Sequence, residues 1–523
     1  MLTFQLPAAE TATRMPVETR PKPTADWLER LPFANPVDVA QQLVTALYAL
    51  NRRELTASLR DELMALYRPT IARAASSLAS GLAAAGVPPL EQQRHTGAVL
   101  RELLNEHSIA YKHLLVAAQT QRGRQATKRL GEISALLLAA LAEIQAVCYL
   151  TYSPSPEGLW LEMHSLYPAA LKSGNTDGTM ADAPPASLTY SHTLLLALAD
   201  PPHMSREEFA HTRLYLGWLG GRAAIGPVPQ NRMDGGFIVR PSLDQGPSAR
   251  PMAPQPGDLW LDTEGVCRQL HAAVSRLRSG ETPRRIGLPA DMDVELSQTL
   301  GKHLLKLWRV GMQRAFKRYP APGSAVQAVA GVGAIHRLLE QLPAAAHDSS
   351  ADSSVVIGDV GTFAAAPGTA VHTSHWTVSN DSARGLALTG APDLPLNLKV
   401  GDALALRGED EENWSLAVIR WIRTGAARQV ELGIERLAPQ VLPVWVRPLR
   451  GQRKARPEPA LLLPGLAALQ QPDRLLLPRY VYQSGMDAEM RQASKHSTLS
   501  FGHRLEYTTS FDLIEFTLAE ASS

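Results

Sequence analysis

The spacing of apolar residues divides the chain into a helical part and a strand-rich part. Between about residues 36 and 175, apolar positions recur every three or four residues, as in the stripe Val39, Leu43 and Leu47. This period matches the α-helix, and helices with one apolar stripe can bury it only against one another. The pattern therefore predicts an N-terminal bundle or array of helices.

A second helical stretch follows, interrupted by two short candidate strands. The strands are GGFIVR (235–240) and GDLWLD (257–262). Helical spacing returns at 263–279 and at 293–318, where Leu300, Leu304 and Leu307 lie on one face. We therefore expect a mixed, mainly helical region before the strand-rich part.

After Pro320 the apolar period shortens to two. Short β-branched or apolar runs alternate with Gly, Asp and Asn turns, which favours a small antiparallel barrel in which Trp414 and Trp421 pack. Beyond a basic linker at 451–459, further strand patterns reach the C-terminus. These strands either extend the barrel or build a second one.

The predicted fold class is thus α+β and multidomain, with an N-terminal helical bundle or array, a mixed middle region and a C-terminal antiparallel β-barrel with additional strands. The expected parts are a disordered leader rich in Pro and Thr (1–35), a helical domain (36–175), the mixed region (188–309), the barrel (310–450) with an internal insertion (335–370), and the C-terminal strands (457–523).

Charge and cysteine content narrow the class of function. The 52 Lys and Arg nearly balance the 50 Asp and Glu, so the chain lacks the positive excess of a general nucleic-acid binder. Only ten of the 52 basic residues are Lys, which leaves 42 Arg. Cys148 and Cys267 are isolated and predict free thiols in a reducing compartment. The N-terminus lacks a signal-peptide pattern, and Glu143 and Gln145 interrupt the most apolar stretch, so we expect a cytoplasmic protein without a transmembrane segment.

Two short motifs lie where the helical pattern gives way to the strand pattern. They are RAFKR, from Arg314 to Arg318, and NDSARG, from Asn380 to Gly385. Their spacings, RxxxR and [D/N]xSxxG, each occur once in the chain. With the strand patterns that follow, this part of the chain resembles the PilZ domain. The resemblance implies a small β-barrel that binds cyclic di-GMP, a bacterial second messenger.

The chemistry of the motif residues suits that ligand. Cyclic di-GMP presents phosphates and the O6 and N7 acceptors of guanine, which the planar guanidinium groups of Arg314 and Arg318 can bind bidentately. Asn380 offers a carbonyl to guanine N–H donors, and Ser382 offers a hydroxyl to the base or a phosphate. Gly385 permits a tight turn or a close approach to the ligand.

The interval between the motifs departs from the family pattern. In PilZ domains a single strand and a short turn usually separate them, whereas here Asn380 lies 62 positions after Arg318. The segment AVQAVAGVGAIHRLLEQL (325–342) is predicted to form the first barrel strand and an extra helix. In the alternative interpretation, the two arginines only face solvent at the end of the helix from residue 293. The resemblance also implies that Gln313, just before RxxxR, influences how many nucleotides bind.

These observations predict a cyclic di-GMP receptor or effector in which nucleotide binding at the barrel alters its arrangement relative to a helical region that binds a protein partner. The alternative is a protein-interaction scaffold whose PilZ-like domain binds no nucleotide. We expect no enzyme, cofactor or metal site, because His372 and His375 lack a supporting Glu or Cys and the sequence has no nucleophile elbow or carboxylate pair.

Overall fold

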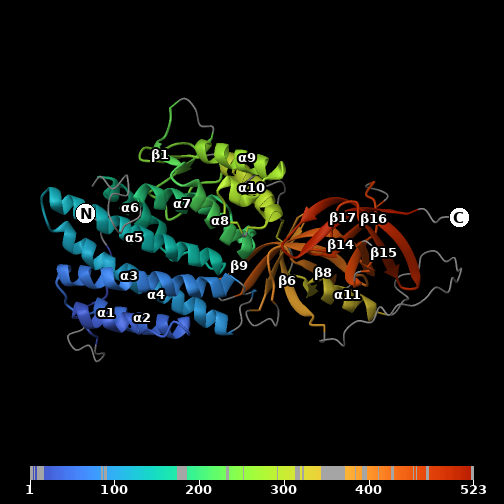
Figure 1. Ribbon diagram of the computed structural model, residues 1–523, viewed down its shortest axis with the longest axis horizontal. Coiled ribbons are helices and arrows are strands. Elements are labelled where there is room, and N and C mark those ends of the chain that lie inside the picture. Colours follow the sequence, from blue (N-terminus) through green and yellow to red (C-terminus); the bar gives the residue numbers. More distant parts are fainter. Residues whose placement is uncertain are drawn as a thin grey trace. The chain divides into compact units, whose positions relative to one another are not determined.

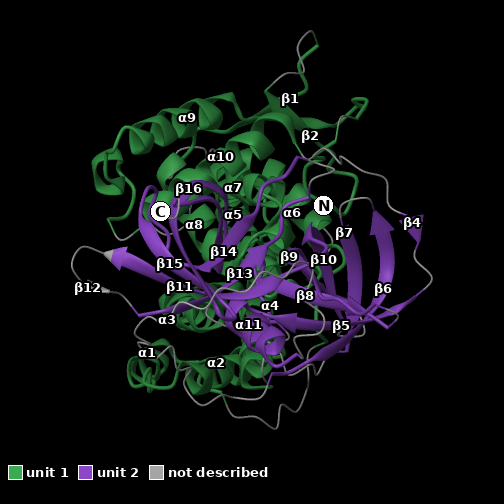
Figure 2. Cartoon of the chain, turned by 90° about the vertical axis from the view of Figure 1, so that its right-hand side faces the viewer, with its two compact units in different colours: residues 1–85, 89–314 green, residues 86–88, 315–523 purple. Residues whose placement is uncertain are grey.

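Helices form the first of two units into which the chain divides, residues 1–85 with 89–314 (green in Figure 2). Its long helix α4 packs against α2, α3 and α5 (Figure 1). The helices in chain order are α1 (Pro21–Glu29), α2 (Pro36–Asn51), α3 (Ala57–Ala83), α4 (Glu91–Gln119), α5 (Arg124–Leu150), α6 (Leu159–Lys172), α7 (Ala186–Leu198) and α8 (Arg206–Leu219).

The computed structural model describes most of the chain. The residues outside the description are 1–3, 5, 9–16, 84–85, 88–90, 173–184, 231–234, 251, 291, 312–318, 321–322, 343–370, 383–384, 392–396, 410, 426–428, 451–452, 455, 467–469 and 520–523.

Local signals explain where several helices begin. Asn35 caps α2 by accepting a hydrogen bond from the Asp38 backbone N–H, and a proline follows at the first helical position. Ser205 and Glu208 form a reciprocal capping box at the start of α8. The expectation of a disordered leader over 1–35 is wrong for its second half, because α1 forms there and buries Leu28 in the helical core.

The apolar helix α5 is the centre of this core. It is the one helix among the described residues that is long and apolar enough to cross a membrane, yet 72% of its most apolar stretch is buried within the unit. Its buried residues include Leu137, Leu138 and Leu141, which are at most 1% exposed. Packing against neighbouring helices therefore accounts for its composition.

The rest of the first unit is the mixed region that the sequence predicts. Strands β1 (Ala224–Pro227), β2 (Gly236–Val239) and β3 (Leu259–Asp262) form a small antiparallel sheet in the order β1-β3-β2. Two short 3-10 helices, η1 (Pro201–His203) and η2 (Pro283–Ile286), accompany helices α9 (Glu264–Arg278) and α10 (Val294–Val310).

Helix α10 ends eight residues earlier than the predicted 318. Gly311 follows it with φ +74° and ψ −175°, a backbone conformation that is essentially restricted to glycine. A Cβ on Gly311 would lie 2.3 Å from the Ala249 carbonyl oxygen, so no other residue fits there without movement. The prediction that Arg314 and Arg318 end this helix is therefore wrong.

Two antiparallel barrels form the second unit, residues 86–88 with 315–523. The first has the strand order β4-β6-β5-β8-β9-β10-β7, and the β6–β7 pairing closes it around six strands. Its strands are β4 (Tyr319–Pro320), β5 (Ala325–Ala330), β6 (Ser374–Ser382), β7 (Gly385–Gly390), β8 (Ala403–Gly408), β9 (Ser415–Thr424) and β10 (Val430–Ala438).

The predicted extra helix of the first barrel is present. Helix α11 (Val332–Glu340) directly follows β5, and β5 then pairs antiparallel with β6. Trp414 and Trp421 are buried, as the sequence predicts, and Gly433 leaves room for the Trp421 indole on the neighbouring strand.

The C-terminal strands build a second barrel rather than an extension. Its order is β12-β11-β13-β14-β17-β16-β15, and β11–β15 pairing closes it. The prediction assigns residues up to 450 to the first barrel, but β11 pairs with β13 and β15 and so belongs to the second. The strands are β11 (Leu442–Arg450), β12 (Arg453–Lys454), β13 (Glu458–Leu463), β14 (Arg474–Pro478), β15 (Asp487–Gln492), β16 (Lys495–Tyr507) and β17 (Phe511–Leu518).

The two barrels share an apolar core. Val329, Leu416 and Val418 of the first barrel belong to the same buried cluster as Leu461 and Phe511 of the second. Ile335 and Leu339 of α11 join this cluster. Burial at the contact therefore holds the barrels together as one unit.

Candidate functional site

The described residues of NDSARG lie at the end of β6, Asn380 to Ser382, and at the start of β7, Gly385. Ser382 pairs with Gly385, Asp381 with Leu386 and Asn380 with Ala387. The Ser382 hydroxyl donates a hydrogen bond to the Gly385 carbonyl at 2.9 Å and so helps to close the turn. The hydroxyl proton is thus used within the protein, but the oxygen retains a lone pair that can accept from a ligand.

A β-bulge directs the side chain at the start of the motif. The register of β6 against β7 shifts between Val378 and Asn380, and Ser379 in the bulge donates to the Ala387 carbonyl at 3.1 Å. Bulges re-aim side chains and are common beside binding sites. The half-buried Asn380 amide makes no hydrogen bond within the described part of the chain, and its contact with guanine remains a prediction.

Gly385 has a steric reason to be glycine. It pairs with Glu435 on β10, and a Cβ at this position would lie 2.0 Å from the Ile434 carbonyl oxygen. The backbone of β7 therefore approaches β10 too closely for any side chain. A ligand contact of Gly385 remains a prediction.

The strand that follows RAFKR in the sequence pairs with the strand in which NDSARG begins. Strand β4 pairs with β6 so that Tyr319 lies opposite Asp381 and Pro320 opposite Asn380. Tyr319 is the residue directly after RAFKR in the sequence, so the pairing is compatible with the predicted site. Gln313, Arg314 and Arg318 themselves lie outside the described residues.

Two residues near the hairpin add to the predicted set. Arg436 on β10 points its guanidinium at the Asp381 carboxylate, with nitrogen–oxygen distances of 3.3 and 3.5 Å, and donates to the Ser382 carbonyl at 3.4 Å. Tyr319 is 65% exposed beside the motif and offers an aromatic face. Sequence reasoning missed both because neither belongs to a motif, and only the strand register places them here.

A cavity of about 910 Å³ lies between the two barrels next to this hairpin. Arg436 lines it together with Arg420 and Glu435 from the first barrel and Arg474 and Glu506 from the second. Both positively and negatively charged side chains therefore surround the cavity.

A charged bridge crosses the same cavity. Arg420 donates to Glu435 at 2.7 Å within the first barrel and to both carboxylate oxygens of Glu506 on β16, at 2.5 and 3.2 Å. Burial alone would lower the pKa of Arg420, but the hydrogen bonds and charges of Glu506 and Glu435 outweigh it and raise the pKa. The bridge therefore ties the strands beside the hairpin to the second barrel.

The closed six-stranded barrel with this hairpin, in a chain that carries RxxxR directly before β4, defines a PilZ-type domain. Three family models match the chain in order: "Cyclic-di-GMP receptor FimW, N-terminal domain" over residues 22–230, "Cyclic-di-GMP receptor FimW, middle PilZ domain" over 361–443, and "FimW C-terminal beta-barrel domain" over 444–519. The chain belongs to the FimW family of cyclic di-GMP receptors, and the predicted PilZ resemblance is confirmed.

A curated relative supports the same assignment along almost the whole chain. The cyclic di-GMP receptor FimW of Pseudomonas aeruginosa is 24% identical over an alignment that covers 96% of this chain and 91% of the relative. The boundary between the last two models, at residues 443 and 444, agrees with the place of β11 in the second barrel. The family is one of receptors, and its descriptions name no enzyme.

Proposed function

We propose that this chain binds cyclic di-GMP at the β6–β7 hairpin and that the nucleotide alters the arrangement of the barrel unit relative to the helical unit. The observation that carries the proposal is the β4–β6 register, which pairs Tyr319, the residue directly after RAFKR, with Asp381 of NDSARG. The name of the Pseudomonas aeruginosa relative supports the same ligand.

The proposed site divides the ligand among named groups. Arg314 and Arg318 bind phosphate oxygens or the guanine O6 and N7 edge, and Asn380 accepts from guanine N–H groups. The exposed guanidinium of Arg436 supplies a third cation, and the ring of Tyr319 a surface on which a base can stack. Gln313, next to the first arginine, sets whether one nucleotide or two are bound.

The coupling to the helical unit follows from where RAFKR lies. The division between the two units falls between residues 314 and 315, inside the motif. A ligand that holds both arginines against the barrel favours those arrangements of the two units in which the arginines can reach the ligand. The ligand shifts the equilibrium between arrangements only by its difference in affinity for them. We propose that the helical unit carries this change to a protein partner in the bacterial cytoplasm.

The first experiment is a calorimetric titration of the full chain with cyclic di-GMP. We expect saturable binding, with a stoichiometry of one or two, that Arg314→Ala and Arg318→Ala each abolish. Arg309→Ala is the matched control, because Arg309 is exposed at the end of α10 and lies outside the motif. Equal affinity of the motif variants and the wild type would overturn the site.

The second experiment addresses the arrangement. Spin labels on α4 and on β16, one in each unit, allow the distance distribution between the units to be measured with and without nucleotide. We expect the distribution to shift on addition of cyclic di-GMP and to stay unchanged in Arg318→Ala. An unchanged distribution in a chain that binds nucleotide would leave the receptor assignment intact and contradict the coupling.

A further inference from the structure

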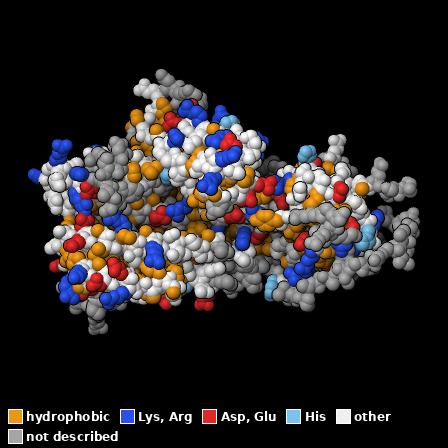
Figure 3. Space-filling view, viewed as in Figure 1, with side chains coloured by type: hydrophobic (Ala, Val, Ile, Leu, Met, Phe, Trp, Pro, Cys, Tyr) orange, Lys and Arg blue, Asp and Glu red, His pale blue; other side chains and the backbone are white. Residues whose placement is uncertain are grey.

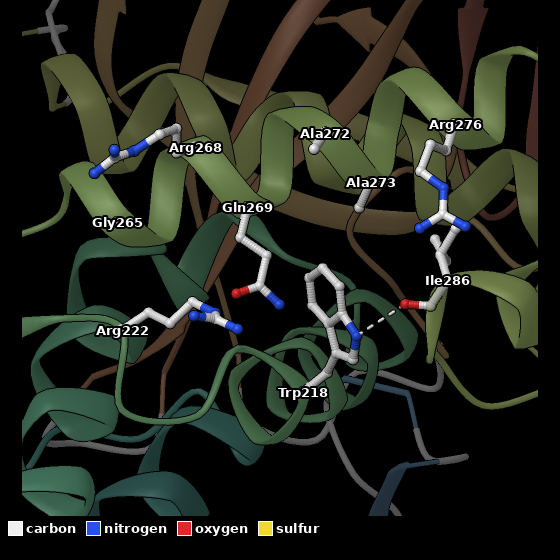
Figure 4. A pocket seen from close by; sticks show the side chains of 9 residues that line it. All are labelled: Trp218, Arg222, Gly265, Arg268, Gln269, Ala272, Ala273, Arg276 and Ile286. Atoms are coloured by element: carbon white, nitrogen blue, oxygen red, sulfur yellow. Dashed lines mark hydrogen bonds between the residues drawn. The ribbon is translucent and has the colours of Figure 1, made fainter.

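A groove of about 760 Å³ in the helical unit lies far from the motifs in sequence (Figure 4). One wall is a face of α9 that runs from Gly265 to Arg276, and the other is formed by Trp218, Arg222 and Ile286. These 11 residue steps of helix span about 16 Å at 1.5 Å per residue. The groove is therefore elongated along α9.

The wall opposite α9 carries an aromatic ring, that of Trp218. The Trp218 indole N–H donates to the Ile286 carbonyl at 3.1 Å, and the half-buried ring packs against the helical core and Tyr215, so part of it remains exposed to the groove. Gly287 follows with φ +88°, and its missing side chain keeps space beside the indole nitrogen, 3.0 Å from where a Cβ would lie. Ala272 and Ala273 line the groove from α9, so its middle is apolar and offers little steric hindrance.

One end of the groove is cationic and not neutralised. Arg222 and Arg268 are exposed, and neither makes a side-chain ion pair or hydrogen bond within the described part of the chain. At the other end Arg276 is held by Glu281, at 2.9 and 2.6 Å, and by the Arg285 carbonyl. An anionic ligand would therefore be drawn to the Arg222 and Arg268 end.

A buried acceptor lies between the cationic end and the ring. Among the residues that the structure describes, Gln269 Oε1 has no hydrogen-bond partner, and it has almost no contact with solvent. Figure 4 shows the Gln269 side chain extending from α9 towards Arg222 and Trp218. An unsatisfied buried carbonyl is costly, and rotation of the Gln269 side chain towards the groove would let a backbone N–H of a bound chain satisfy it.

The chain segment around the groove also carries a net positive charge. Figure 3 shows Lys and Arg side chains over the part of the surface where Figure 1 places α9. Between residues 264 and 286 the chain carries two acids and five arginines: Glu264 and Glu281 against Arg268, Arg276, Arg278, Arg284 and Arg285. Such a field attracts acidic partners.

We propose that this groove, hereafter the α9 groove, binds an acidic segment of a protein partner in extended conformation. A span of about 16 Å takes roughly five residues at 3.3 Å each, longer than a compact anion needs. A carboxylate side chain binds between Arg222 and Arg268, a backbone N–H donates to Gln269, and an apolar side chain packs on Trp218. The proposal specifies the partner chemistry for the helical unit of the proposed function, and its test uses no nucleotide.

The test is a selection of random 12-residue peptides displayed on phage, against the purified full chain. We expect the enriched peptides to carry Asp or Glu next to an aromatic or aliphatic residue. A synthetic copy of the most enriched peptide, labelled with fluorescein, is then titrated by anisotropy. Arg222→Glu with Arg268→Glu should weaken its binding at least tenfold, while Arg278→Glu on the same helix, outside the groove, should change it less than twofold.

Three results would overturn the proposal. They are a selection without enrichment, enriched peptides without acidic residues, and equal binding to the double variant whose circular dichroism spectrum matches the wild type. Displacement of the peptide by adenosine monophosphate at equal concentration would instead assign the groove to a small anion. Loss of cyclic di-GMP binding in the motif variants leaves all of these outcomes unaffected, so the two proposals fail separately.

Discussion

The guanidinium of Arg436 on β10 faces the carboxylate of Asp381 at the end of β6, with Nη1 3.3 Å from Oδ1 and Nη2 3.5 Å from Oδ2. Both side chains are close to half exposed. An exposed pair with such long contacts contributes at most about 1 kcal/mol to folding. The arginine can therefore exchange its partner for a phosphate of a bound nucleotide at little loss.

Removing this guanidinium should affect binding more than folding. Arg436→Ala is expected to lower the free energy of unfolding by less than about 1 kcal/mol. The dissociation constant for cyclic di-GMP should rise roughly tenfold, since one charge-assisted contact of about 1.4 kcal/mol is lost. Calorimetry and urea unfolding of the same preparation measure both quantities.

Arg423→Ala is the matched control for this variant. Arg423 is also exposed, but in the strand register it lies opposite Glu431 of β10. Glu431 is four residues along β10 from Glu435, the residue opposite Gly385 of the hairpin. That distance is about 13 Å along the strand. Nucleotide affinity should be unchanged in this control, and a wild-type affinity of Arg436→Ala would exclude Arg436 from the site.

Gly385→Ala should destabilise the barrel unit. The new Cβ would lie 2.0 Å from the Ile434 carbonyl oxygen, which belongs to backbone and cannot rotate away. Forced strand movement of this kind costs typically 1–3 kcal/mol, so we expect about 2 kcal/mol less stability in urea unfolding. Gly333→Ala in α11 is the control. Among the described residues the new Cβ would lie near Pro459 alone, at an ordinary contact distance of 3.9 Å, and alanine has the higher helix propensity. A fully stable Gly385→Ala would contradict the close strand approach.

The sequence predicts the order of architectures because periodicity reports local backbone geometry. The helical stripe with Val39 and Leu43 lies in the buried core, and β5 with α11 forms where the long interval predicts a strand and a helix. Periodicity does not report pairing partners, which depend on contacts between distant segments. For this reason the sequence pattern places β11 in the wrong barrel, and it does not distinguish an extension of the first barrel from a second barrel.

The site shows the same limit. The motifs predict Asn380, Ser382 and Gly385 as one cluster, and the hairpin brings these three together. The helix end was misplaced because the apolar spacing does not reveal that Gly311 lies against the Ala249 carbonyl. Arg436 is one exposed arginine among 42, and no local pattern distinguishes it.

Acid should destabilise the helical unit through His107 on α4. Burial, with a contribution from the charge of Arg68, lowers the pKa of His107 to about 4 from the ordinary 6.5. Between about pH 6.5 and pH 4 the imidazole is therefore protonated in the unfolded chain but neutral in the folded chain. The free energy of unfolding falls as the pH decreases through this window. Between pH 7 and pH 5 this residue alone should remove about 2 kcal/mol.

Urea unfolding of His107→Gln at the two pH values measures that contribution. We expect the stability difference between pH 7 and pH 5 to shrink by about 2 kcal/mol relative to the wild type. His95→Gln, at an exposed position of the same helix, should leave the difference unchanged. An identical pH dependence in His107→Gln and the wild type would show that His107 does not resist protonation.

The bridge from Arg420 to Glu506 should couple the two barrels energetically. Arg420 donates to both oxygens of Glu506 and also to Glu435, so the guanidinium is held from both barrels. A double-mutant cycle of Arg420→Met and Glu506→Gln removes the pair while Glu435 stays in place. Because these partly buried groups form a network, we expect a coupling energy of about 1–2 kcal/mol in urea unfolding. The exposed pair of Arg276 and Glu281 is the control and should give less than about 0.5 kcal/mol. A coupling energy no larger than this control would show that the apolar cluster shared by the barrels, and not the bridge, holds them together.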